Sequence, residues 1–527
     1  MPTHYLEPKS GAHPFAYDPP AARPDIFLIT CDMIPPESYD PASPLRQVLH
    51  TPNMDRLFAD GVGFSHACCT SPLCGPSRAS YLTGRYSYMT VNEERAHDGW
   101  QAILRPDDAI FPEYLRATGY LTRHAGKGHV GTERFLAAFG ENDSPWNRWA
   151  PPLTDDEGYT AYLDGLGLQP PVWPEPLTGL RPDRTTPGNS YGGWITQANG
   201  APFPIEGLYD QYLAQQATRK LDHALRQRAD GQPLYLQLDF FSPHQPFLIP
   251  ESLRDRAAEL AAHISLPETY GQALSGSADW PRVYDFYRRN WGLYDPDVAR
   301  QYLVFNFLQI ELLDEALGRF LRELDRRGLY DSSLILFTGD HGEMNTERAL
   351  IDKGVYGHPK VARVPLAAKL PANEAAGQQL DQLVSLLDLA PTILGTAGIT
   401  PADRQDGHSL LPLIRGERTT RPAFIFEAGW HVCPNPAVSY FAQVDGRSWM
   451  YTYNLTARDE LYDMDHPTYA DVAADPAFAD LKLHLIRELG AFLESDPRWT
   501  CYWHTFRLDK FAELGAPSGD FQMYKPF

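Results

Sequence analysis

The chain has 527 residues, and its composition of 43% apolar, 12% aromatic and 21% charged residues is typical of a globular protein. Its formal net charge of −21 argues against nucleic acid and anionic membranes as partners. It contains no run of about 18 apolar residues, so we expect no membrane-spanning helix. If a protein this acidic binds an anion, it needs cationic side chains gathered locally where the anion binds.

The N-terminus and the cysteines bear on the cellular compartment. The first residues contain no apolar segment of the kind that a secretion signal needs, so we expect a cytoplasmic protein. A precursor that has lost its leader would instead be periplasmic or secreted. Six cysteines are few for this length, at positions 31, 68, 69, 74, 433 and 501. We therefore expect reduced, mostly buried thiols rather than a disulfide framework.

Short apolar runs alternate with helical patterns along most of the chain, after a Pro- and Ala-rich arm at 1–22. The predicted strands are apolar runs typical of buried parallel sheets, at 25–30, 120–125, 234–238 and 334–337. The predicted helices have apolar spacing or end signals, at 51–61, 74–84, 111–118, 210–229, 298–327 and 380–394. This alternation predicts an α/β fold with a large, mostly parallel sheet sandwiched by helices.

Two long stretches, 143–207 and 265–297, are aromatic and show no clear period. Long stretches of this kind in compact proteins are usually functional loops, so we expect irregular segments that wall a pocket or form a lid. The first stretch holds four tryptophans that would form either an aromatic wall or part of the core: Trp146, Trp149, Trp173 and Trp194.

The composition becomes polar and basic near 411–422, where we place a domain boundary. Antiparallel strands are predicted after it, at 424–426, 439–444 and 448–453, followed by a helix at 478–494. The last residues are too aromatic for a free tail, so we expect them to pack on this chain or on a second copy in a homo-oligomer. The predicted units are the arm (1–22), a catalytic domain (23–415) and a smaller α+β domain (416–527).

Polar side chains follow three of the predicted strands. Asp32, His244 and the pair Asp340-His341 each come after an apolar run, and Cys74 begins a predicted helix. The carboxyl ends of strands in an open parallel sheet are where ligands gather, so these side chains are expected to share one site. Carboxylate oxygen and imidazole nitrogen are suitable ligands for one divalent metal ion.

The stretch that begins at Cys74 is the most specific feature of the sequence. Cys74-Gly-Pro-Ser-Arg78, followed by Leu82-Thr-Gly-Arg85, resembles the signature Cys/Ser-x-Pro-Ser/Ala-Arg and Leu-Thr-Gly-Arg of the type I sulfatases, which belong to the alkaline phosphatase superfamily. The segment that starts Thr51-Pro-Asn is also similar to that family, and the resemblance extends from about residue 25 to 413. In this family the cysteine is oxidised to Cα-formylglycine by a maturase.

Carried over by position, the resemblance implies four metal ligands: Asp32, modified Cys74, Asp340 and His341. It implies sulfate-binding and proton-transfer roles for Arg78, Lys127, His129, His244 and Lys353, of which Lys127, His244 and Lys353 would bind the substrate. Calcium is the family's usual ion, and manganese stays open. Met33 stands where many relatives have Asp or Gln, and a thioether is a poor ligand for a hard cation, so we expect no coordination by it.

The resemblance implies hydrolysis of a small sulfate ester by a formylglycine hydrate, with Asp340 as base, His244 and Lys353 at the leaving group and His129 assisting sulfate release. The first alternative is a formylglycine-dependent phosphonate monoester or phosphodiester hydrolase. Members of that group tend to carry Tyr and Thr in place of Lys127 and His129. The Lys and His in this sequence therefore favour a sulfate ester over a phosphonate or phosphodiester as substrate. The second alternative is a non-catalytic metal- and anion-binding protein in which Cys74 stays a thiol.

Several other points stay open at this stage. Asp239 either orients His244 or ends its strand, and neither His97-Asp98 nor His358 receives a role from spacing alone. Aryl, alkyl, choline-like and sugar sulfates all remain candidate substrates.

Overall fold

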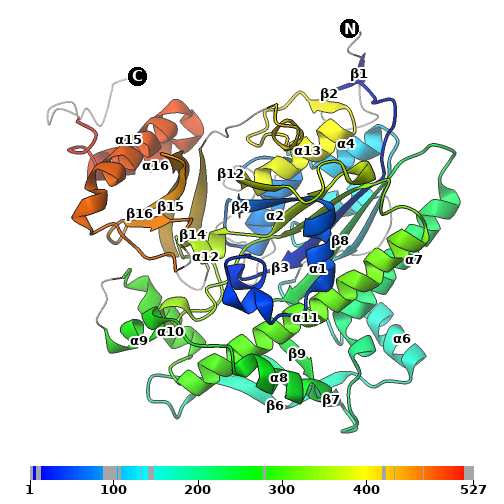
Figure 1. The fold of residues 1–527 in the computed structure, drawn as a ribbon, viewed down its shortest axis with the longest axis horizontal. Helices are drawn as coiled ribbons and strands as arrows, with labels where there is room; N and C mark the ends of the chain where they lie inside the picture. Colours follow the sequence, from blue (N-terminus) through cyan, green and yellow to red (C-terminus); the bar gives the residue numbers. More distant parts are fainter. Residues whose placement is uncertain are drawn as a thin grey trace.

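The structure is a computed structural model, and it describes residues 4–6, 14–86, 104, 108–131, 133–139, 148–276, 280–417, 423–431, 434–466 and 468–515. At its centre lies a seven-stranded sheet in the order β12-β4-β11-β10-β3-β8-β5 (Figure 1). These strands span Gln379–Ser385, Val62–Cys68, Leu366–Lys369, Leu334–Gly339, Ile26–Asp32, Leu234–Pro243 and Leu121–Gly126. Only β11 runs antiparallel to its neighbours, so the predicted mostly parallel sheet is confirmed.

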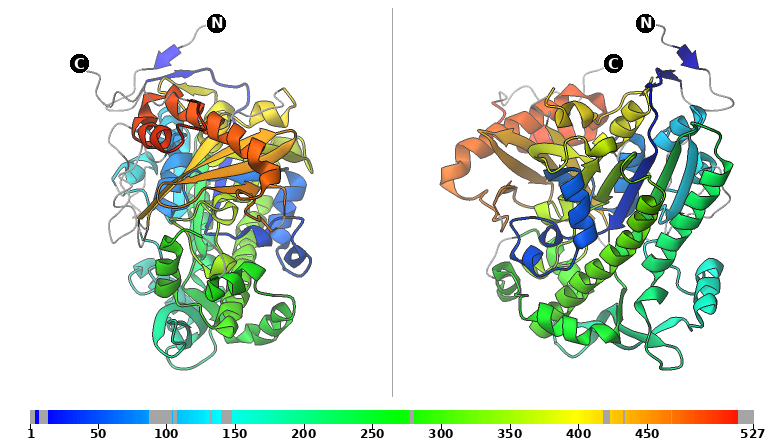
Figure 2. Two further views of the ribbon diagram at one scale, coloured as in Figure 1. Left: turned by 90° about the vertical axis from the view of Figure 1, so that its left-hand side faces the viewer. Right: turned by 45° about the vertical axis from the view of Figure 1, so that its right-hand side comes forward.

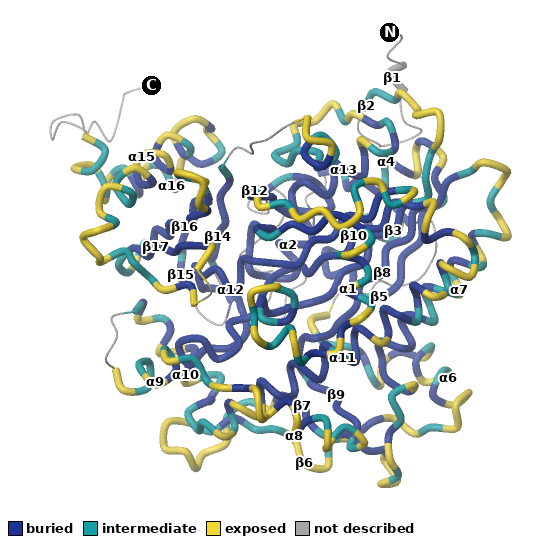
Figure 3. Tube along the Cα trace, in the orientation of Figure 1, coloured by how far each residue is buried: buried dark blue, intermediate teal, exposed yellow. Residues whose placement is uncertain are grey.

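Helices cover both faces of this sheet because its central strands are apolar on both sides. In β3, Ile26 and Leu28 face one hydrophobic core, whereas Phe27 and Ile29 face the other. The first core packs against α2 (Cys74–Thr83), α4 (Phe111–Ala117) and α13 (Leu389–Thr396). The second core packs against α1 (Pro52–Asp60), α7 (Tyr209–Gln227) and the 31-residue α11 (Pro296–Arg326). Figure 3 shows the strands between these layers as the buried centre of the molecule.

Three predictions of local structure were wrong. The stretch 143–207 contains α6 (Glu157–Leu166) and a hairpin of β6 (Pro171–Leu180) and β7 (Pro187–Gln197). The stretch 265–297 contains α9 (Glu268–Ser275) and α10 (Val283–Trp291). The register of the hairpin shifts at several points, and its prolines and glycines interrupt the alternation by which a strand is recognised.

The third error is the helix predicted at 380–394. Its first part is β12, and the helix α13 begins only at Leu389, after a 3₁₀ turn at Leu386–Asp388. The apolar period cannot distinguish a short buried strand from part of a buried helix. The signal that marks the end of the strand is Ser385, whose hydroxyl caps the 3₁₀ turn.

The C-terminal part forms a second, antiparallel sheet of β14 (Phe424–Trp430), β15 (Pro434–Val444), β16 (Arg447–Asn454) and β17 (Glu460–Asp463). Helices α15 (Ala479–Ser495) and α16 (Thr500–Asp509) lie against this sheet, as Figure 2 shows in orange and red. The predicted strands and helix of this region are confirmed. The division at 416 stays a prediction, because residues 418–422 lie outside the described part.

Both ends of the described chain are fastened to the body of the molecule. In the arm, β2 (Phe15–Tyr17) pairs with β13 (Ile399–Pro401) and with β1 (His4–Leu6). Trp499 is 1% exposed and packs edge-on against Tyr86, with ring centres 5.2 Å apart. The aromatic segment thus packs on this chain as far as it is described, and the homo-oligomer stays a prediction. In the described ranges, no helix combines the length and the apolar character needed to cross a membrane.

Candidate active site

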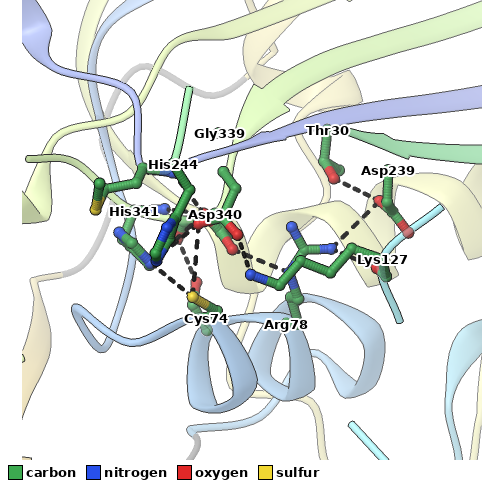
Figure 4. Close-up of polar contacts among 12 residues, drawn as sticks. Thr30, Cys74, Arg78, Lys127, Asp239, His244, Gly339, Asp340 and His341 are labelled. Atoms are coloured by element: carbon green, nitrogen blue, oxygen red, sulfur yellow. Dashed lines mark hydrogen bonds and ion pairs between the residues drawn. The ribbon is translucent and has the colours of Figure 1, made fainter. Parts of the chain in front are cut away.

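Four potential metal ligands meet at the carboxyl edge of the central sheet. Asp32 ends β3, and Asp340 and His341 follow β10, which is its parallel neighbour. Cys74 is the first residue of α2, and its Sγ lies 3.2 Å from His341 Nε2 (Figure 4). The same sulfur lies 3.5 Å from Asp32 Oδ1. The ligand atoms of all four residues lie within 4.8 Å of one another, and all four residues are buried.

This set of donors fits one divalent cation. Asp340 Oδ1 accepts hydrogen bonds from the backbone N–H groups of Met33, at 3.1 Å, and His341, at 2.9 Å, so its carboxylate is held in place. His341 Nδ1 lies 2.9 Å from Gly342 O, which leaves Nε2 toward Cys74. Burial and the facing Asp32 carboxylate raise the pKa of Asp340. A cation between two buried carboxylates would remove this repulsion.

Two buried cations lie beside the carboxylates. Arg78, one turn into α2, donates from Nε to Asp340 Oδ2 at 2.9 Å and from Nη1 to Lys127 O at 2.8 Å. Its Nη2 is buried, and it has no hydrogen-bond partner among the described residues. Lys127 Nζ donates to Asp32 Oδ2 and, at 3.1 Å, to Trp149 O. Arg78 and Lys127 are therefore the locally gathered cations that an acidic protein needs if it binds an anion.

Two glycines are needed for this arrangement. Gly84 ends α2 with a φ of 69°, in the left-handed region that glycine adopts without strain. At Gly126, β5 approaches β8 so closely that a Cβ would lie 1.8 Å from Asp239 O. The same carbonyl accepts from Lys127 N at 3.0 Å, so the close approach fixes the direction in which Lys127 leaves its strand.

The electrostatics of residue 74 follow from these neighbours. Burial and Asp32 oppose ionisation of the Cys74 thiol, but Lys127, Lys353 and His341 outweigh them and hold its pKa well below the usual value. In the same way, burial disfavours ionised Asp32, yet the charges of Lys127 and Lys353 keep its pKa well below the usual value. The site therefore stabilises negative charge at position 74 and at the oxygens beside it.

His244 and Lys353 form a second pair at the same edge. Lys353 Nζ contacts His244 Nε2, and His244 Nδ1 lies 2.6 Å from Gln245 O, so Nδ1 carries the proton and Nε2 accepts one from the ammonium group. Burial and the Lys353 charge lower the pKa of His244 to about 3. Burial disfavours the ammonium ion, but Asp352 Oδ1, 3.0 Å from Nζ, and Cys74 raise the pKa of Lys353. A neutral imidazole thus lies beside a charged lysine.

Comparison with known proteins identifies the family. The family profile "Sulfatase" matches residues 42–399, and the profile "N-sulphoglucosamine sulphohydrolase, C-terminal" matches residues 346–494. The chain belongs to the sulfatase family. The predicted membership in the type I sulfatases of the alkaline phosphatase superfamily is confirmed, and with it the class of sulfuric ester hydrolase.

This sulfatase is similar to several named proteins. It is 27% identical over 464 residues to a choline-sulfatase from Rhizobium meliloti (strain 1021), and this match covers 84% of this chain and 80% of that protein. It is 27% identical over 416 residues to an arylsulfatase from Clostridium perfringens (strain 13 / Type A), covering 76% and 80%. The phosphonate monoester hydrolase SpPMH from Silicibacter pomeroyi superposes with a TM-score of 0.64 at 20% identity, covering 88% of this chain and 94% of that one. This last likeness confirms the alkaline phosphatase-like fold.

The other candidate residues of the sulfatase have mixed outcomes. Asp239 lies within β8, accepts from His124 Nε2 at 2.8 Å and from Gln237 Nε2 at 2.7 Å, and is 3.7 Å from Arg78 Nη1. It therefore supports Arg78. It lies inside its strand rather than at the end, and among the described residues its side chain contacts Arg78 and not His244. His129 is buried, with a φ of 57°, and its role stays a prediction.

The remaining residues singled out in the sequence take part in packing or lie outside the described residues. His358 caps α12 (Pro359–Ala362), and its ring packs on Tyr462, with ring centres 5.0 Å apart. Trp173 and Trp194 are partly buried against the second core. The thiols of Cys31, Cys68 and Cys69 are buried, as expected. Residues 97, 98 and 146 are not described.

A cavity of about 280 Å³ opens beside His244 and Lys353. Its wall consists of Trp149, Asn189, Ser190, Tyr191, His244, Gln245, Trp291, Asp352, Lys353 and His431. Both stretches expected to be irregular, 143–207 and 265–297, contribute residues to this wall. The prediction that they wall a pocket is therefore confirmed, although the prediction that they are irregular was wrong. Sequence reasoning missed Gln245, Asp352 and His431, and the only available signal was that the first two adjoin His244 and Lys353.

Proposed function

We propose that this sulfatase hydrolyses a sulfate ester to an alcohol and inorganic sulfate, with formylglycine at position 74 and one divalent cation. The observation that carries the proposal is the buried group of Asp32, Cys74, Asp340 and His341 donors within 4.8 Å of one another, bordered by Arg78 and Lys127. The names of the curated relatives, a choline-sulfatase and an arylsulfatase, support the same reaction class.

The modification and the metal supply what unmodified side chains lack. Formylglycine, made from Cys74 by a maturase, would supply a hydrated aldehyde with one hydroxyl to attack sulfur and a second to release sulfate afterwards. A divalent cation held by Asp32, Asp340, His341 and residue 74 would offset the charge of the sulfate oxygens. The carboxylate oxygens favour Ca²⁺, as in the family, and Mn²⁺ is the second candidate.

The surrounding cations would hold the transferred group. Arg78 Nη2 is buried without a partner in the described chain, which leaves an N–H group for a sulfate oxygen. Lys127 Nζ is fixed by Asp32 and by the Trp149 carbonyl, so its charge stays at the base of the site. Preorganised charges of this kind stabilise the transition state without reorganisation during the reaction.

The proton for the leaving oxygen would come from Lys353. His244 is neutral, with its proton on Nδ1 toward Gln245 O, so it has no proton on the nitrogen that meets Lys353. The Lys353 ammonium donates to that nitrogen and is held by Asp352. We therefore assign the general-acid role to Lys353 and a positioning role to His244, where the family resemblance alone implied both equally.

A panel of esters tests the proposal. The chain is coexpressed with a formylglycine-generating maturase, and conversion is verified by an intact-mass decrease of about 18 Da. Release of inorganic sulfate from aryl, alkyl and sugar sulfates is expected, with loss of turnover in Cys74→Ala. Preference for a phosphonate monoester by orders of magnitude would instead establish the alternative hydrolase. An unmodified mass together with no turnover would identify a non-catalytic homologue.

A further inference from the structure

The loop that carries Lys353, residues 342–357, has an unusual backbone. It connects β10 to α12, and five of its non-glycine residues have φ between 48° and 68°: Asn345, Thr346, Arg348, Ala349 and Asp352. L-residues rarely adopt this left-handed conformation, and several of them in one loop persist only where surrounding contacts enforce them. Asp352 directly precedes Lys353, so the contacts that hold this backbone also decide where the ammonium group lies.

The C-terminal sheet (β14–β17) supplies such contacts just after Lys353. Asn435 Nδ2, in β15, donates to Val355 O at 2.9 Å, and Thr452 Oγ1, in β16, donates to Gly357 O at 3.0 Å. Both donors are 0% exposed. These two hydrogen bonds attach the loop, two and four residues after Lys353, to a surface that belongs to another part of the fold.

The same sheet also holds the loop before Lys353. Arg348 Nη1 donates to Glu460 Oε1 at 2.6 Å, and Nη2 donates to Tyr462 Oη at 2.8 Å, both in β17. Arg348 and Glu460 are 2% and 0% exposed, so the ion pair is shielded from water. The loop is therefore attached to the C-terminal sheet on both sides of Lys353.

The contact between the loop and the C-terminal part is also close. At Gly354, the residue after Lys353, a Cβ would lie 2.4 Å from His431 Cβ. The loop also binds itself, because Glu343 Oε1 accepts from Asp352 N at 2.6 Å. A bond within the loop fixes its shape but not its place relative to His244, whereas a bond to the C-terminal sheet fixes its place.

We propose that the C-terminal sheet positions the proton donor of the reaction: Asn435 and Thr452 hold the loop so that the Lys353 ammonium group lies at the leaving oxygen. This inference rests on the proposed function and on Lys353 as its acid. A general acid acts only within hydrogen-bond reach, and a misplacement of about 1 Å can cost about 10²-fold in rate. Asn435 and Thr452 are thus positioning residues that act through Lys353.

The test is the double variant Asn435→Leu/Thr452→Val, which removes both hydrogen bonds at nearly constant side-chain volume. With the maturase-converted enzyme, kcat/KM is measured for 4-nitrophenyl sulfate and for the best alkyl or sugar sulfate. Nitrophenolate departs without a proton, so we expect the ratio of alkyl or sugar activity to 4-nitrophenyl activity to fall by about tenfold or more.

The matched control is Tyr451→Phe. Tyr451 precedes Thr452 in β16 and therefore faces the opposite side of the sheet, where its hydroxyl donates to Asp459 Oδ2 at 2.9 Å. This variant also removes a buried hydrogen bond from the C-terminal part, but away from the loop, so it should keep the wild-type ratio.

The contrary results are distinct. An unchanged ratio, equal losses on both esters, or wild-type turnover of 4-nitrophenyl sulfate alone would overturn the inference while leaving a sulfatase. No sulfate release from any ester by the wild type, with residue 74 fully converted, would overturn the proposed function and this inference with it.

A second measurement does not depend on turnover. Hydrogen exchange of residues 342–357 should become faster by about tenfold or more in the double variant, but not in Tyr451→Phe, while exchange of β10 stays unchanged in both. Should the double variant fail to fold, Thr452→Val alone is measured in the same way. Exchange of the loop at the wild-type rate would overturn the inference.

Discussion

Replacement of Lys353 by Met would test its assignment as proton donor. Lys353 is 1% exposed, and its ammonium contacts His244 Nε2, Asp352 Oδ1 at 3.0 Å and Met33 Sδ at 3.6 Å, so it is firmly oriented. General-acid catalysis contributes about 10²–10⁴-fold when the leaving group is a poor one. We therefore expect Lys353→Met to lower kcat/KM for alkyl and sugar sulfates by that factor, but for 4-nitrophenyl sulfate by less than about tenfold, because nitrophenolate departs without a proton.

The same replacement also affects stability, and the structure suggests how to separate the two effects. Although burial disfavours the carboxylate, Lys353 lowers the pKa of Asp352 from its usual 3.8 to about 2, which corresponds to about 2 kcal/mol. Asp352 is 2% exposed, so the loss of its partner should cost about 3–5 kcal/mol of unfolding free energy. The double variant Lys353→Met/Asp352→Asn removes both charges and should recover most of this stability, measured by denaturant unfolding.

The double variant then decides the catalytic question. It should be stable, yet it should keep the selective defect with alkyl and sugar sulfates. Lys482→Met, a partly buried lysine that binds Ala473 O in the C-terminal region, is the matched control and should have wild-type activity on every ester. Equal losses on 4-nitrophenyl and alkyl sulfate in the double variant would refute the assignment of Lys353 as the acid.

Two further predictions concern the metal and a buried acid. Chelation of the metal ion should abolish turnover and lower the Tm, because a ligand bound to the native state stabilises that state. Addition of Ca²⁺ or Mn²⁺ should restore both turnover and Tm. Full turnover in protein shown to be metal-free by elemental analysis would contradict this prediction. Burial raises the pKa of Asp210 to about 6, so the folded state binds a proton more tightly than the unfolded state and stability falls as pH rises from about 4 to 6. Asp210→Asn should therefore raise the unfolding free energy by up to about 3 kcal/mol at pH 8 but hardly at pH 4. The control Asp164→Asn, at an exposed position, should change it little at either pH. An equal effect of Asp210→Asn at both pH values would show that the carboxylate is not responsible.

Much of the site was predictable from local patterns. The apolar runs before Asp32 and Asp340 identify strands, and parallel strands bring their carboxyl ends to the same edge whatever the details of packing. The Cys74 signature begins a helix whose first residue faces that edge. These positions depend on residues close in the sequence, so the sequence sufficed for the family, the sheet and the set of potential ligands.

The cavity beside His244 and Lys353 could not be predicted in the same way. Tyr191 comes from the hairpin, Trp291 from α10 and His431 from the residue after β14, and these elements meet only in the folded chain. The ionic states of His244 and Lys353 likewise depend on burial and on neighbours distant in sequence. The sequence alone therefore determined the chemistry at the sheet edge, because strand ends and a helix start are local features. Only the tertiary structure decided which residues enclose the cavity beside that edge, because the cavity is shaped by long-range packing.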